Sequence, residues 1–71
     1  MKIVFKNLGR DKWNGEVQIP DNSTPDDIMD KALKEASKRL ATRFPDVSYN
    51  YEKKTGTIEA GYRTVGEFLV V

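Results

Sequence analysis

The chain has 71 residues, 38% of them hydrophobic and 32% charged, and its 12 basic and 11 acidic side chains give a formal net charge of +1. A chain of this length buries only about 60% of its unfolded surface, so it forms one domain with a modest core. The near-neutral charge supplies no overall field for attracting nucleic acid or an anionic membrane, and the absence of cysteine excludes a disulfide-stapled secreted mini-protein, which favours a cytoplasmic location.

The first predicted element is a hairpin. Residues 1–8 alternate apolar and polar side chains with the period of a strand, and a second alternating segment follows a turn at residues 9–12. The side chains predicted on the apolar face of this hairpin are Met1, Ile3, Phe5, Trp13, Val17 and Ile19. Gly15 interrupts that face, which predicts a bulge or a close approach of another group to the backbone there.

The second predicted element is an amphipathic helix. Thr24 is suited to cap its N-terminus, and Pro25 is suited to its first position. Asp26 and Asp27 complement the positive end of the helix dipole, and Pro45 stops the helix within a few residues. The predicted buried stripe comprises Ile28, Met29, Ala32, Leu33, Ala36, Leu40 and Phe44. The opposite faces carry Asp30, Lys31, Lys34, Glu35, Lys38, Arg39 and Arg43.

A second hairpin is predicted after the helix. Residues 47–52 and 57–63 each alternate apolar and polar side chains, and residues 53–56 form the turn between them. We expect the aromatic side chains on the apolar side of this pattern to pack in or beside the core. They are Tyr49, Tyr51 and Tyr62.

The C-terminal segment leaves the number of strands open. Residues 56–71 form one strand if the chain continues straight and two if it bends near Gly61 or Gly66. The apolar run at residues 68–71 is far shorter than the roughly 20 residues of a membrane span, so we expect no membrane partner. It predicts a central or well-paired strand; the alternative is an edge strand through which the chain forms a homo-oligomer or accepts a partner's strand.

These elements predict a single small α+β domain over residues 1–71. Its order is β-β-α-β-β(-β), with one amphipathic helix packed on one face of a four- or five-stranded sheet. The order, and the opening Met1-Lys2-Ile3-Val4-Phe5-Lys6-Asn7-Leu8 in particular, resembles the β-grasp family typified by ubiquitin, over the first half of the chain. Family members that are conjugated or thiolated end in Gly-Gly, whereas this chain ends in Leu69-Val70-Val71, so that chemistry is not carried over.

The amino-acid composition gives little support for a catalytic function. Histidine and cysteine are absent, which removes the commonest general base, the commonest metal ligand and a thiol nucleophile. Carboxylates crowd the helix entrance, but capping explains them, and their loop lacks the glycine and the terminal glutamate of an EF-hand. We therefore expect no enzyme, no cofactor, and no catalytic or metal-ligating residues. The carboxylates are those of Asp21, Asp26, Asp27 and Asp30.

Two functions remain. The first is a small non-catalytic protein-protein interaction module, an adaptor or inhibitor, that binds another protein through a sheet edge or through the open polar face of the sheet. The alternative is a small nucleic-acid-binding protein that uses the basic helix face and a second-hairpin turn packed near the C-terminal end of the helix. The candidate phosphate contacts are Lys34, Lys38, Arg39, Arg43, Lys53 and Lys54.

Overall fold

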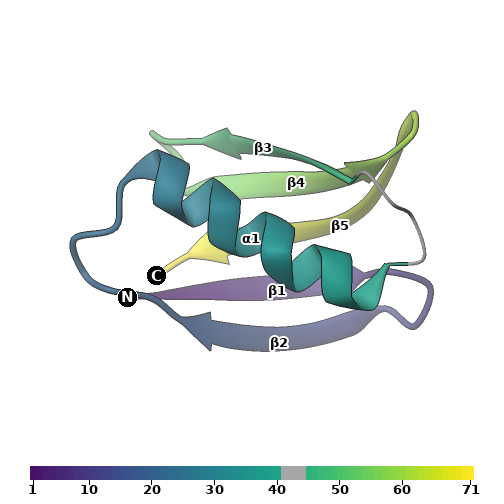
Figure 1. Cartoon of the computed structure of the whole chain (residues 1–71), viewed down its shortest axis with the longest axis horizontal. Coiled ribbons are helices and arrows are strands. Elements are labelled where there is room, and N and C mark those ends of the chain that lie inside the picture. Colours follow the sequence, from purple (N-terminus) through teal and green to yellow (C-terminus); the bar gives the residue numbers. More distant parts are fainter. Residues whose placement is uncertain (41–44) are drawn as a thin grey trace.

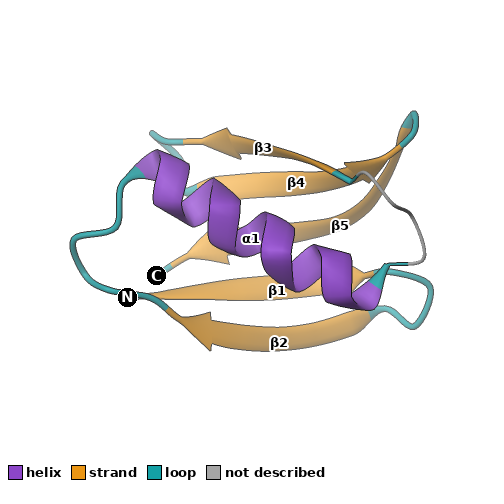
Figure 2. Cartoon of the chain, in the orientation of Figure 1, coloured by secondary structure: helices purple, strands orange, loops and turns teal. Residues whose placement is uncertain are grey.

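The computed structural model describes residues 1–40 and 45–71. In these residues, one helix lies diagonally across one face of a five-stranded antiparallel sheet (Figure 1). The elements are β1 (Lys2–Leu8), β2 (Trp13–Gln18), α1 (Pro25–Arg39), β3 (Asp46–Asn50), β4 (Thr55–Ala60) and β5 (Arg63–Val70). The strand order is β2-β1-β5-β4-β3, so the last strand lies in the middle and α1 falls in the chain between the two edge strands (Figure 2).

The predicted α+β domain is confirmed, and the open question about the C-terminal segment is answered. Gly61, with a φ of +67°, takes the left-handed conformation in the turn that separates β4 from β5. β5 pairs with β1 on one side and with β4 on the other, so the apolar run belongs to an internal strand. The alternative prediction, in which residues 68–71 form an edge strand that pairs with another chain, is therefore wrong. The β-grasp arrangement is not confirmed by this fully antiparallel sheet.

The core lies between α1 and the sheet face that it covers. Side chains from all five strands and from the apolar face of α1 pack together in it. One helix is therefore enough to cover the apolar face of the sheet. The buried apolar residues are Ile3, Phe5, Leu8, Ile19, Ile28, Ala32, Ala36, Ile58, Phe68 and Val70.

Two strand glycines make room for aromatic rings in this core. A Cβ added to Gly15 would lie 2.2 Å from the Trp13 ring, and one added to Gly56 would lie 2.1 Å from the Phe68 ring. The predicted close approach at Gly15 is thus confirmed. The bulge in this hairpin falls in β1 instead, where Asn7 has a φ of 53° and its N–H donates to Asn14 Oδ1 at 3.1 Å.

Two tyrosines predicted beside the core are exposed instead. Tyr51 is 69% exposed and Tyr62 is fully exposed, because both follow the last residue of a strand and lie in turns, where the alternation of faces ends. Glu35, predicted on a solvent face, is buried, and its carboxylate lies 3.3 Å from the Lys38 amine. Leu33 is only half-buried.

The helix ends earlier than Pro45 implies. Its last residue is Arg39, and Leu40 follows in an extended conformation, with its N–H donating to the Ala36 carbonyl at 3.0 Å. Phe44, which was predicted to close the apolar stripe, lies outside the described residues.

The helix begins where the sequence predicts. The Asp27 N–H donates to Thr24 Oγ1 and the Thr24 N–H donates to Asp27 Oδ2, both at 3.1 Å, so the two residues form a capping box. We expect Thr24→Ala to lower the free energy of unfolding by about 1 kcal/mol, because one backbone donor loses its partner. Urea unfolding would measure this loss. Thr24→Ser, which keeps the hydroxyl, should retain most of the stability, and equal losses in the two variants would contradict the capping role.

Candidate functional site

No described helix or strand covers the face of the sheet opposite α1 (Figure 1). Side chains alternate between the two faces of a strand, so those neighbouring the core residues in sequence point to this open face. Its residues include Lys2, Val4 and Lys6 of β1, Asn14, Glu16 and Gln18 of β2, Asp46, Ser48 and Asn50 of β3, Thr55, Thr57 and Glu59 of β4, and Glu67 and Leu69 of β5.

Strand register places an apolar pair at the centre of the open face. Val4 lies directly opposite Leu69, and both side chains are half-buried. Leu69 in turn lies opposite Thr55, and Thr55 lies opposite Asn50 at the edge strand. From the apolar centre toward the edge strand β3, the open face therefore presents first the hydroxyl of Thr55 and then the amide of Asn50.

The next row across the sheet is polar throughout. Lys6 lies opposite Glu67, Glu67 opposite Thr57, and Thr57 opposite Ser48. On the β2 side, the Lys2 amine lies 2.5 Å from a Glu16 carboxylate oxygen. Opposite charges thus lie on neighbouring strands at the β2, β1 and β5 positions, whereas Asp46 of β3 lies opposite Glu59 of β4, so this end of the face is acidic.

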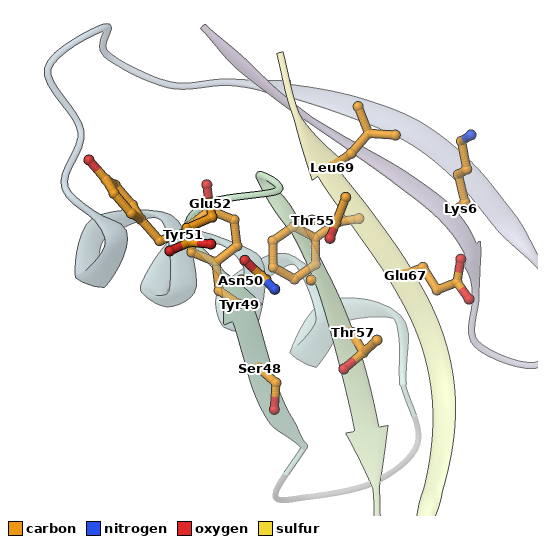
Figure 3. Close-up of a pocket in the computed structure, with 12 residues that line it drawn as sticks. Lys6, Ser48, Tyr49, Asn50, Tyr51, Glu52, Thr55, Thr57, Glu67 and Leu69 are labelled. Atoms are coloured by element: carbon orange, nitrogen blue, oxygen red, sulfur yellow. The ribbon is translucent and has the colours of Figure 1, made fainter.

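A shallow hollow of about 820 Å³ lies over β3, β4 and β5 on this side (Figure 3). It exists because the outward side chains of β3 and β4 are short. Leu69 and Lys6 bound it toward β1, and the turn residue Tyr51 bounds it at the opposite end. The polar groups around it are the hydroxyls of Ser48, Thr55 and Thr57, the amide of Asn50, and the carboxylates of Glu52 and Glu67.

Tyr49 connects the hollow to the core. Its ring stacks on that of Phe68, with centroids 5.9 Å apart and an interplanar angle of 18°. Burial of Tyr49, assisted by the neighbouring phenol of Tyr51, raises the pKa of Tyr49 above its ordinary value. The Tyr49 phenol therefore stays protonated at neutral pH, and its hydroxyl keeps its hydrogen to donate.

The basic residues predicted to contact phosphates do not form one surface. Lys34, Lys38 and Arg39 belong to α1, whereas Lys53 and Lys54 lie in the turn between β3 and β4. That turn is beside the N-terminal end of α1, at the opposite end of the molecule from Arg39 (Figure 1). The sequence-based expectation that the turn packs near the helix C-terminus is wrong. Arg43 lies outside the described residues.

Two of the helix cations already have protein partners. The Arg39 guanidinium lies 3.5 Å from the centroid of the Trp13 ring, in a cation-π contact, and the Lys38 amine pairs with Glu35. A phosphate contact by either residue would have to compete with these interactions.

The sequence pattern predicts the polar side of β1, β2 and β3, but it assigns Thr55 to the turn at residues 53–56 and does not indicate the apolar centre of the open face. Val4 was recognisable as an interruption of the polar side of β1, whereas its neighbour Leu69 belonged to an uninterrupted apolar run that assigns no face. The signal for the hollow was the series of small residues at positions 48, 55, 56 and 57, and it became meaningful only through the β3-β4 register.

Residues 1–40 and 45–71 contain no group of three or more acidic side chains placed to hold a metal ion, and no helix in them is long and apolar enough to cross a membrane. Comparisons of the chain with protein-family models, with curated proteins and with solved structures found no match.

Proposed function

We propose that the protein is a small non-catalytic interaction module, an adaptor or inhibitor, that binds another protein through the open face of its sheet. The observation that carries this proposal is the half-buried pair of Val4 and Leu69, framed by rows of hydroxyl, amide and paired charged groups. If this face met only water, polar side chains at positions 4 and 69 would be expected, because the solvent side of an antiparallel sheet is usually polar.

The chemistry of the face fits a protein partner. Protein interfaces combine an apolar centre with a polar rim, and their centres are depleted in charge. Here the apolar centre is Val4 and Leu69, and the charged groups Lys6, Glu16 and Glu67 lie in the surrounding positions. A nucleic-acid surface would instead need an excess of positive charge, whereas the carboxylates of Glu16, Asp46, Glu59 and Glu67 outnumber the amines of Lys2 and Lys6 on this face.

The same proposal places the protein in the cytoplasm and assigns it no reaction. Support for both comes from the composition: the chain contains neither cysteine nor histidine, so it needs no oxidising compartment and lacks the commonest catalytic base.

The proposal predicts that a charge at the apolar centre abolishes partner capture. A tagged wild-type chain, Leu69→Glu, Thr57→Glu and Ser37→Glu would be compared as baits, with nuclease present. Ser37→Glu is the matched control, because it adds the same charge at an exposed helix position. For the captured protein, we expect Leu69→Glu to weaken affinity by at least about 30-fold, as loss of a central contact does.

Circular dichroism of each bait would establish that it is folded, and Thr57→Glu supplies a face variant outside the central apolar pair. A partner that is kept by Ser37→Glu and lost by both face variants would support the open face as the binding surface. A partner bound equally by all four baits, or enrichment that disappears with nuclease, would refute it.

A further inference from the structure

The two edges of the sheet differ in regularity. β3 pairs with β4 without any shift in register, and its five residues contain neither proline, nor glycine, nor lysine. β2 contains Gly15 and pairs with the bulged part of β1. Bulges, lysine and proline are the usual devices that prevent edge strands from pairing with another chain. Apart from its short length and the charge of Asp46 at its first position, β3 carries none of these protections.

The backbone groups left free along β3 follow from the hydrogen bonding of β4. The Val70 N–H donates to the Lys54 carbonyl at 2.8 Å, so the even-numbered residues of the β4 segment next to it, including Gly56, direct their backbone groups toward β5. The odd-numbered residues of that segment therefore bond to β3. Their partners are Ser48 and Asn50, which leaves the N–H and C=O groups of Val47 and Tyr49 pointing away from the sheet.

This pattern is self-complementary. When a second copy of β3 is placed antiparallel to the first around a twofold axis at Ser48, Val47 faces Tyr49 of the second copy, and Asp46 faces its Asn50. Each Val47-Tyr49 pair can exchange two backbone hydrogen bonds, because both residues have free groups on that side. Tyrosine opposite valine is a favourable cross-strand pair, and asparagine opposite aspartate brings a donor to a carboxylate.

The other edge strand, β2, also has outward backbone groups. The Ile19 N–H donates to the Met1 carbonyl, so the outward backbone groups of β2 are those of even-numbered residues such as Glu16 and Gln18. The alignment equivalent to that at Ser48 centres on Val17, whose backbone groups bond to β1, and it places Glu16 opposite Gln18 of the second copy. Gly15 and the bulged pairing with β1 make β2 the less regular edge, so we assign the contact with a second copy of this chain to β3.

We propose that the protein self-associates into a twofold dimer by antiparallel pairing of β3 with β3, in the register centred on Ser48. Two five-stranded sheets then become one of ten strands, and the two open faces lie side by side on it. The hollow over β3 and β4 is continued by its copy across the new strand pair. The dimer does not depend on the proposed binding of another protein.

Sedimentation velocity would test the pairing over concentrations from roughly 10 µM to 1 mM, a range that suits an interface of one short strand from each copy. The informative variants are Ser48→Glu and Ser48→Lys, because residue 48 lies on the axis and its side chain is exposed. Each variant alone should dissociate about fivefold more readily, whereas an equimolar mixture should associate more tightly than either variant alone. Gln18→Glu, an exposed substitution at the β2 edge, is the control and should behave as the wild type.

A second variant tests the backbone pairing itself. Val47→Pro removes an N–H that points away from the sheet, a position at which an edge strand tolerates proline, so the monomer should fold and the dimer should be lost. A wild-type chain that stays monomeric up to the highest concentration would overturn the proposal. It would equally be overturned if Ser48→Glu dimerised like the wild type, or if Gln18→Glu were the variant that lost association.

Discussion

Replacing Phe68 by alanine should lower the free energy of unfolding by about 3 to 5 kcal/mol, the range for truncating a buried phenylalanine. Phe68 is only 2% exposed in the central strand β5. Its ring lies 6.1 Å from that of Phe5 and stacks on Tyr49, so the substitution leaves a cavity between two other aromatic side chains. Urea denaturation followed by Trp13 fluorescence would measure the loss.

The size of this effect matters because the domain is small. A chain of this length is expected to have a total stability of roughly 4 to 11 kcal/mol, so the loss of Phe68 would consume a large share of it. Val71→Ala is the control: Val71 is 58% exposed, and its truncation should change the stability by less than about 0.5 kcal/mol. A loss below about 1 kcal/mol in Phe68→Ala would show that this aromatic cluster does not organise the core.

Local sequence patterns were sufficient to predict the elements whose determinants are themselves local. Thr24 and Pro25 predict the helix start because both are suited to the first positions of a helix, and the structure adds a capping box between Thr24 and Asp27. The alternation in β1 likewise predicts that Ile3 and Phe5 face the core, as both do. These are short-range preferences that the tertiary structure reinforces.

The predictions that failed depend on where each element ends or on which elements become neighbours. Tyr51 and Tyr62 continue the alternation of the preceding strand, yet both lie in turns, where that alternation no longer determines burial. Glu35 is buried although its helix position is polar, and its carboxylate finds Lys38 one turn later. Nothing in the local pattern distinguishes Glu35 from the exposed acidic residues of the same helix.

The candidate site was only partly predictable for a related reason. The open face needed only the alternation of side chains within each strand, which directs residues such as Ser48 and Thr57 away from the core. Its apolar centre needed the pairing of β1 with β5, two segments separated by almost the whole chain. The register between strands that are far apart in the chain depends on the pairing of the whole sheet, so it cannot be predicted from the local pattern of one sequence.

Gly56→Ala should be the most destabilising glycine-to-alanine substitution in β4 and the turn that follows it, with a loss of about 3 kcal/mol. The new methyl group would lie 2.1 Å from the Phe68 ring and 2.6 Å from the Ser48 carbonyl oxygen. The ring can move only by disturbing the aromatic cluster, and the carbonyl oxygen can move only with the backbone of β3. Chemical denaturation would measure the loss, with Gly61→Ala as the matched control. Gly61 has nothing within 4 Å of an added methyl group, and only its φ of +67° opposes alanine, so the control should lose about 1 kcal/mol.

A double-mutant cycle separates the two contacts of Gly56. In a Phe68→Leu background the ring is absent, so Gly56→Ala should be less costly there by at least about 1 kcal/mol, and the remaining loss reports the contact with the Ser48 carbonyl. Additive losses would mean that the ring of Phe68 does not occupy the space above Gly56. This result would contradict the packing seen in the structure. In that packing, the absence of a side chain at Gly56 makes room both for the Phe68 ring and for the close approach of the β3 backbone at Ser48.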